Sequence, residues 1–94
     1  MSASQNYHVR HILVRHRYEI DDLAKKLQAG VKFTELARKF STCPSASSGG
    51  DLGVLRLGQA DIDFEEAALA LNENEITANP VRTRFGYHLI QRIK

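Results

Sequence analysis

Residues 7–14 read Tyr-His-Val-Arg-His-Ile-Leu-Val, and this stretch decides the fold. Its β-branched and aromatic residues predict a strand. Side chains alternate between the two faces of a strand, so Val9, His11 and Leu13 share one face. Ile12 points to the other face. The sequence therefore places His11 among apolar neighbours on a rigid element.

The segments that follow predict two helices. Apolar residues recur with the spacing i, i+3, i+4, i+7 over about residues 18–29 and again over about 33–40. Gly30 ends the first helix, because glycine adopts the left-handed conformation at low cost. Residues 41–51 form a loop rich in small and turn-forming types, and this loop holds the only cysteine. A short strand is expected over residues 52–57.

A third, short helix is expected to begin near residue 63. Asp63 is followed three residues later by Glu66, a spacing that predicts a capping box, and the helix would run to about Leu71. Asn74 then suits a left-handed turn.

The chain closes with two strand-like segments. They cover residues 76–82 and 87–93, and the turn at 83–86 joins them as a hairpin. The complete order is strand, helix, helix, strand, helix, strand, strand. We therefore expect an α+β fold with a mostly antiparallel sheet.

Composition limits the classes of protein that fit. With 94 residues, 43% of them hydrophobic and 26% charged, the chain suits one soluble domain over residues 1–94, with an ordered core from about residue 7. A net charge of +2 argues against nucleic acid, and no apolar run approaches the roughly 20 residues that span a bilayer. One cysteine and no signal-peptide pattern favour a cytoplasmic protein, which we expect to be a monomer.

Three residues are candidates for chemistry: His11, Cys43 and His88. Each has an ordinary structural alternative, because a histidine on an apolar strand is often a core residue and a single cysteine often behaves as a small apolar one. Spacing alone leaves both readings open. No compact metal-ligand spacing occurs, so we expect no metal site. Residues 49–53 are glycine-rich but lack the Lys-Ser/Thr of a phosphate loop.

Five motifs occur in order along the chain, and together they are highly specific. They are His-Ile-Leu-Val at 11–14, Gly-Gly-Asp-Leu-Gly at 49–53, Gly-Gln at 58–59, Phe-Glu-Glu-Ala at 64–67 and Phe-Gly-Tyr-His-Leu-Ile at 85–90. In this the sequence resembles the parvulin family of peptidyl-prolyl cis/trans isomerases. The stretch Phe-Ser-Thr-Cys-Pro-Ser at 40–45 is most similar to the short, single-domain bacterial peptidyl-prolyl isomerase C group.

The resemblance implies a parvulin (FKBP-like) fold, a four-stranded antiparallel sheet with three to four helices. It implies non-covalent, cofactor-free rotation about X-Pro bonds in peptides and unfolded proteins. The implied catalytic positions are His11, Cys43, His88 and Thr83, and the implied substrate-binding positions are Leu52, Ala60, Phe64, Gln59 and Phe85. Some parvulins carry Asp at the cysteine position, so the resemblance implies an active-site position there rather than a nucleophile.

The sequence departs from the family pattern at three places. Ala60 replaces a common Met, Leu55 a common aromatic residue and Asp63 a common Pro. The shorter Ala60 is expected to weaken substrate binding through lost contact area. If exposed, Asp61 and Asp63 favour basic or neutral segments over phosphorylated ones; alternatively, Asp63 only caps its helix.

Two other classes of function stay open at this point. One is a peptide-binding or chaperone module with little isomerase activity. The other is a cysteine hydrolase, which would need an activated thiolate and an oxyanion hole. Nothing beyond the histidines and the cysteine supports the hydrolase.

Overall fold

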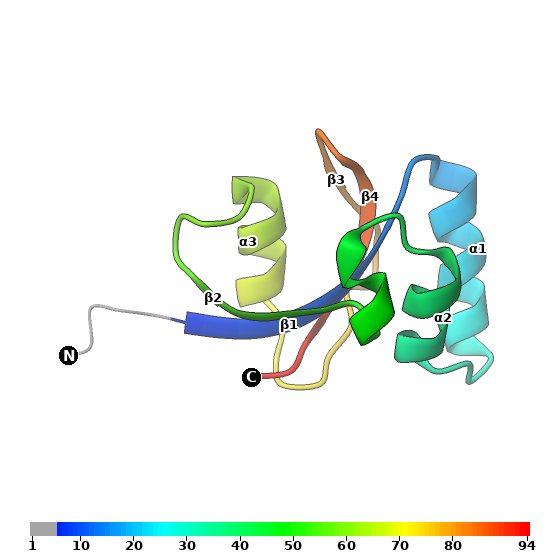
Figure 1. The fold of residues 1–94 in the computed structure, drawn as a ribbon, viewed down its shortest axis with the longest axis horizontal. Helices are drawn as coiled ribbons and strands as arrows, with labels where there is room; N and C mark the ends of the chain where they lie inside the picture. Colours follow the sequence, from blue (N-terminus) through cyan, green and yellow to red (C-terminus); the bar gives the residue numbers. More distant parts are fainter. Residues whose placement is uncertain (1–5) are drawn as a thin grey trace.

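The structure, a computed structural model, describes residues 6–94. One antiparallel sheet has the strand order β2-β1-β4-β3 (Figure 1). The strands are β1 (Asn6–Val14), β2 (Asp51–Arg56), β3 (Val81–Thr83) and β4 (Gly86–Arg92), and the helices are α1 (Arg17–Gln28), α2 (Phe33–Phe40), the 3-10 helix η1 (Pro44–Ser48) and α3 (Ile62–Leu69). The expected fold class and order of elements are confirmed.

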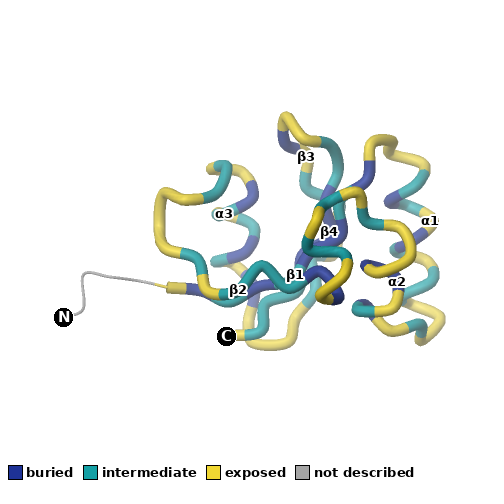
Figure 2. Tube along the Cα trace, in the orientation of Figure 1, coloured by how far each residue is buried: buried dark blue, intermediate teal, exposed yellow. Residues whose placement is uncertain are grey.

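Apolar side chains cover the two faces of the sheet with different helices. On one face Ile12, Val14 and Leu89 pack with buried residues of α1 and α2. On the other face Val9 and Ile90 pack with the buried residues of α3. Figure 1 shows α1 and α2 together at one end of the molecule and α3 at the other. The alternation predicted for β1 therefore holds, and buried positions follow the sheet through the centre (Figure 2).

Helices α1 and α2 and two turns lie close to their predicted positions. Helix α2 covers Phe33–Phe40 as expected, and α1 ends just before Gly30, which has φ +100°. Asn74 is left-handed with φ +68°, also as expected. Within residues 6–94, no helix has both the length and the apolar character needed to cross a membrane.

The strand predicted over residues 76–82 is wrong for most of its length. Only β3 (Val81–Thr83) pairs regularly with β4, and Ile76 makes one isolated bridge to Gln91. Thr77 still donates its N–H to the Ile90 carbonyl at 2.9 Å, and Val81 pairs with His88, so residues 78–80 bulge out opposite Leu89 alone. Pro80 lies in this bulge and has no N–H to donate to a ladder, which explains the interruption.

The predicted start of the third helix is also wrong. Asp61, not Asp63, is the N-cap of α3, and its Oδ1 accepts the Asp63 N–H at 3.0 Å. The Glu65 N–H donates to the Asp61 carbonyl at 2.9 Å and begins the helical ladder. Both aspartates suit a cap, but the earlier one adds two residues to the first turn. The helix ends at Leu69 rather than about Leu71.

Candidate active site

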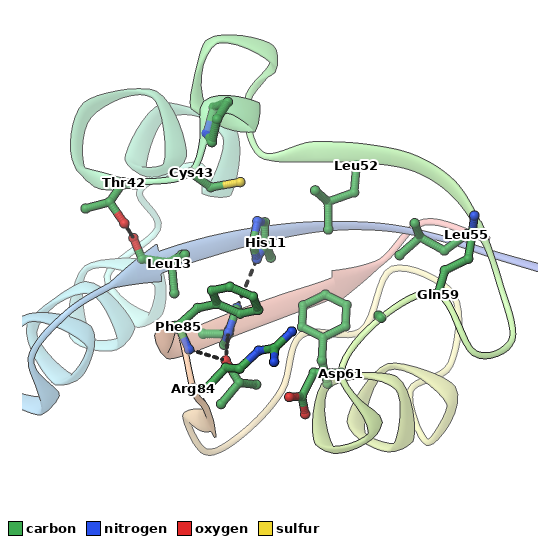
Figure 3. Close-up of a pocket in the computed structure, with 15 residues that line it drawn as sticks. His11, Leu13, Thr42, Cys43, Leu52, Leu55, Gln59, Asp61, Arg84 and Phe85 are labelled. Carbon is green, nitrogen blue, oxygen red and sulfur yellow. Dashed lines mark hydrogen bonds between the residues drawn. The ribbon is translucent and has the colours of Figure 1, made fainter.

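A groove lies on the α3 side of the sheet, with a volume of about 470 Å³ (Figure 3). Its floor is formed by β1 and β4, and its walls by the segment before η1, by β2 and α3, and by the β3–β4 hairpin. All nine site residues named from the sequence line this groove. They are His11, Cys43, Leu52, Gln59, Ala60, Phe64, Thr83, Phe85 and His88.

Two histidines lie side by side at the floor of the groove. In the antiparallel register His11 pairs with Ile90 and Leu13 with His88, so the two imidazoles are diagonal neighbours on one face. Their Nδ1 atoms are 3.0 Å apart, and the rings stack with centroids 5.2 Å apart. The topology brings together two residues that are 77 positions apart in the chain.

Both imidazoles are buried, and burial disfavours their charged forms. Burial, with a smaller repulsion from His88, lowers the pKa of His11 from 6.5 to about 4. Burial lowers the pKa of His88 to about 4 as well, although Asp61 opposes this shift. The pair is therefore neutral at pH 7, and one ring must donate its Nδ1 proton to the other.

Thr83 connects the histidine pair to the backbone of the β3–β4 hairpin. Its Oγ1 accepts the Phe85 N–H at 3.2 Å and lies 2.7 Å from His88 Nε2. When the Thr83 hydroxyl donates to His88 Nε2, the proton of His88 is on Nδ1. His88 Nδ1–H then donates to His11 Nδ1. This leaves the proton of His11 on Nε2, a buried atom without a partner among the described residues.

Cys43 is held over this pair by the segment that precedes η1. The Ser41 hydroxyl accepts the Leu13 N–H at 3.0 Å and the Cys43 N–H at 3.4 Å. The Thr42 N–H donates to the Leu13 carbonyl at 2.8 Å. Figure 3 shows the Cys43 sulfur above the His11 ring, facing the groove.

Gly50 holds the β2 end of the groove against β1. Its carbonyl accepts the His11 N–H at 2.9 Å, and its φ is +88°. A Cβ at this position would overlap the His11 carbonyl oxygen. Only glycine allows so close an approach in this conformation, which accounts for the glycine at this point of the Gly-Gly-Asp-Leu-Gly motif.

An apolar pocket adjoins the histidines. Phe64 is buried, and its ring is roughly perpendicular to both imidazoles. The centre of the Phe64 ring lies 5.6 Å from that of His11 and 5.2 Å from that of His88. Leu52 and the small Ala60 are half-buried and complete this part of the groove. At the opposite end, the ring of Phe85 is 59% exposed. The groove thus pairs an apolar slot with a buried array of neutral hydrogen-bonding groups.

Comparison with known proteins agrees with this geometry. The sequence model of the family described as rotamase, PPIC-type PPIASE domain, matches residues 11–94. The chain belongs to the PPIC-type parvulin family of peptidyl-prolyl isomerases.

Two curated parvulin relatives illustrate the match. The foldase protein PrsA of Bacillus subtilis is 45% identical over 83 residues, covering 87% of this chain and 28% of that protein. The chaperone SurA of Burkholderia thailandensis is 43% identical over 93 residues, covering 89% of this chain and 20% of that protein. This parvulin chain therefore spans between 20% and 28% of the length of these relatives.

Solved parvulin structures share the fold. The crystal structure of PrsA from Bacillus subtilis superposes with a TM-score of 0.90 at 41% identity, covering 95% of this chain and 35% of that one. The solution structure of NmPin, the parvulin of Nitrosopumilus maritimus, gives 0.83 at 35% identity, covering 99% of this chain and all of that one.

The parvulin groove also contains residues that the sequence did not single out as site residues. They are Leu13, Thr42, Pro44 and Arg84. The groove is also lined by Leu55, which replaces a common aromatic residue of the family, and by Asp61, which the sequence placed beside the pocket. Leu13 shares the strand face of His11, so the period-2 pattern could have found it. Arg84 and Thr42 had no such signal, because a turn and a loop have no fixed side-chain period.

Gln59 is partly engaged by the fold. Its Oε1 accepts the Arg56 N–H at 2.6 Å, so its side chain closes the turn after β2 and leaves only its amide nitrogen for a ligand. Within residues 6–94, no group of three His, Cys, Asp or Glu side chains lies close enough to hold a metal ion.

Proposed function

We propose that this groove catalyses cis/trans isomerisation of X-Pro bonds in peptides and unfolded proteins, without a covalent intermediate and without a cofactor. The observation that carries the proposal is the apolar slot beside Phe64, placed directly against the neutral His11–His88 pair. Such a site can grip a proline ring on one side and hold its amide in a water-poor environment on the other.

The physical task is rotation about one bond. The amide C–N bond resists rotation through its double-bond character, and uncatalysed X-Pro isomerisation takes roughly 10–100 s at 25 °C. A twisted amide is less polar than a planar one. A dry groove therefore stabilises the twisted form relative to the planar form, and that difference lowers the barrier.

We assign the proline ring to Leu52, Ala60 and Phe64, which line the apolar end of the groove. Gln59 and Phe85 flank the peptide on its two sides. A ring held there leaves the preceding carbonyl near Cys43 and the Nε2–H of His11. The methyl-sized Ala60 contributes less contact area than a longer side chain, so we expect modest substrate affinity.

We assign a positioning role to the array of His11, His88 and Thr83. Each of its hydrogen bonds fixes the next, from the Phe85 N–H through Thr83 to the two imidazoles. Burial keeps the rings neutral, and these hydrogen bonds hold them in place below the substrate. Preorganised dipoles need no rearrangement as the amide twists, and this favours the transition state.

Cys43 acts as a polar contact and not as a nucleophile in this proposal, because attack on an unactivated amide needs a stabilised thiolate and an oxyanion hole. The test replaces Cys43 with Asp and with Ser. We expect Cys43→Asp to keep substantial turnover. If both variants lost turnover while still binding peptide, the covalent route would be favoured instead.

The activity itself is tested with a protease-coupled assay on a chromogenic proline peptide and by refolding of a proline-limited protein. We expect both to be accelerated. Leu52→Glu places a charge in the groove and should abolish the acceleration. Val54→Glu is the matched control, because Val54 lies on the same strand, is 62% exposed and does not line the groove. No acceleration by the unmodified chain would refute the proposal.

The second candidate is a binding module for unfolded chains. It is favoured by the names of the relatives, a chaperone and a foldase, and by the small Ala60. Suppression of aggregation of an unfolded protein without any catalysis of proline isomerisation would support this candidate over the isomerase.

We further propose that the chain acts as a cytoplasmic monomer. The half-buried free thiol of Cys43 in the groove supports a reducing compartment. NmPin, whose whole solved chain this one covers, has the same fold without a further domain in its structure, which supports the monomer. Light scattering of the purified chain tests the oligomeric state, and cell fractionation tests the compartment.

A further inference from the structure

We propose that two carboxylates outside the groove, Asp51 and Glu65, hold the wall of the proline slot in place, so that substrate affinity depends on groups that do not contact the substrate. The inference rests on the proposed function and adds two positioning residues to it. Neither carboxylate lines the groove, but each accepts a backbone hydrogen bond from the segment 51–61, which supplies one of the walls.

A bulge in β2 decides which of its side chains face the groove. Between two consecutive pairs of the β1–β2 register, β2 has two residues, Leu52 and Gly53, where β1 has only one. In a regular strand Leu52 and Leu55 would point to opposite faces, because they are three positions apart. The extra residue reverses this, and both leucines line the groove (Figure 3). The bulge therefore brings Leu52 into the slot.

Asp51 fixes this bulge from the other face of the sheet. Its Oδ1 accepts the Gly53 N–H at 2.7 Å and lies 2.7 Å from His8 Nε2. His8 and His11 are an odd number of positions apart on β1, so His8 points away from the groove. Gly53 has φ +73°, a left-handed conformation that glycine adopts without strain. One carboxylate oxygen thus ties the bulge to the neighbouring strand.

The Asp51 side chain is held in its charged form. Burial raises its pKa, but the Gly53 N–H, the hydrogen bond to His8 and the nearby charges of His8 and Arg10 lower it by more in total. The net effect is a pKa below the usual value for aspartate. Both hydrogen bonds therefore have a charged acceptor, and such bonds are roughly twice as strong as neutral ones.

Glu65 holds the other end of the wall. Its Oε1 accepts the Gly58 N–H at 2.9 Å and the Tyr7 hydroxyl at 3.1 Å. Burial, together with the hydrogen bond to Glu65 and its charge, raises the pKa of Tyr7 to about 12, so the phenol keeps the proton that it donates. Glu65 directly follows Phe64 in α3. The bond from Gly58 therefore fixes the loop that carries Ala60 against the helix that carries Phe64.

The sheet itself supports this wall on one side only, because β2 is an edge strand that pairs with β1 alone. Without either carboxylate, Leu52 or Ala60 can move away from Phe64. The proline ring contacts these residues in both the planar and the twisted amide. Loss of such contacts weakens binding of the two forms alike, so it raises KM and leaves kcat nearly unchanged.

The test measures KM and kcat for a proline peptide in Asp51→Ala and Glu65→Ala. Each change removes the acceptor of two hydrogen bonds, and we expect KM to rise about five- to tenfold with little change in kcat. Asp51→Asn and Glu65→Gln keep an oxygen that can accept the same bonds. These two variants should restore KM to within about twofold of the unmodified value.

Two milder variants keep the test independent of folding. Tyr7→Phe keeps the buried ring and removes only the hydroxyl that donates to Glu65, and His8→Leu removes only the imidazole beside Asp51. Each should raise KM by about two- to threefold. Glu66→Ala and Val54→Ala are matched controls, because both residues are exposed and lie outside the groove. They should leave KM unchanged.

Circular dichroism establishes that each variant is folded at the assay temperature. A lower Tm with an unchanged KM in the alanine variants and in the two milder ones would overturn the inference, because the carboxylates would then only stabilise the fold. A fall in kcat at constant KM would overturn it as well. Titration of the same peptide by NMR gives its Kd without any turnover. If the unmodified chain binds the peptide but does not catalyse rotation, the proposed function fails, and the Kd values of the same variants still decide whether the carboxylates position the wall.

Discussion

Acidification should destabilise this protein through its histidine pair. Burial lowers the pKa of His11 and of His88 from 6.5 to about 4. The unfolded chain therefore binds more protons than the folded one between these two values. Stability is fully present above pH 6.5 and falls as the pH falls towards about 4. At about pH 5 the free energy of unfolding is lower by about 2 kcal/mol for each imidazole than at about pH 7.5. For the pair together it is lower by about 4 kcal/mol.

Urea unfolding at about pH 7.5 and about pH 5 measures this loss directly. A fall of about 4 kcal/mol is a large share of the 5–15 kcal/mol that typical domains possess. The double variant His8→Gln, His16→Gln is the control, because it removes the two histidines outside the groove and should keep the full loss.

The imidazole proton signals provide a second readout that does not depend on unfolding. The signals of His11 and His88 should titrate near pH 4 in the folded protein. Equal stability at the two pH values, together with titration of both signals near 6.5, would refute the reasoning that the pair is held neutral by burial.

Three further predictions concern packing and the groove. Gly50→Ala should lower the free energy of unfolding by about 3 kcal/mol or more, and Gly53→Ala by about 1–2 kcal/mol, as measured by thermal unfolding. Both glycines have left-handed backbone, but only at Gly50 would the added methyl group collide with the β1 backbone. Phe64→Ala should cost about 3–5 kcal/mol of stability, whereas Phe85→Ala should leave stability nearly unchanged and raise the KM of a proline peptide. Thr83→Val should lower kcat while Thr83→Ser preserves it, because serine keeps the hydroxyl that orders the imidazoles; equal kcat in the two variants would argue against that role.

Local patterns in the sequence predicted most of the elements. Residues 33–40 and 7–14 have strong periods, and their helix and strand were located to within a residue. The two wrong predictions, the start of the third helix and the strand over residues 76–82, concern segments in which the local sequence fits two arrangements. Asp61 and Asp63 both suit an N-cap, and only packing of α3 decides between them. Ile76 and Val81 both suit a strand, but Pro80 between them breaks the ladder.

The site was predictable as a set of residues but not as an arrangement. The spacing of His11 and His88 in the chain says nothing about a hydrogen bond, because the register of β1 against β4 creates that contact. The hydrogen bond that holds Thr83 comes from the Phe85 N–H, a backbone group that has no signature in the sequence. Arg84 is likewise placed only by the geometry of the hairpin.

The central strand pair also has a consequence for synthesis in the cell. Because β1 is synthesised before β4, His11 has no partner until His88, 77 positions later in the chain, has been synthesised. Contacts of such long range close late in folding. The nascent chain therefore has no assembled groove until residue 88 has emerged, and a chain stalled before that point displays an apolar strand instead of an isomerase. Biosynthesis itself thus sets the moment at which the activity appears.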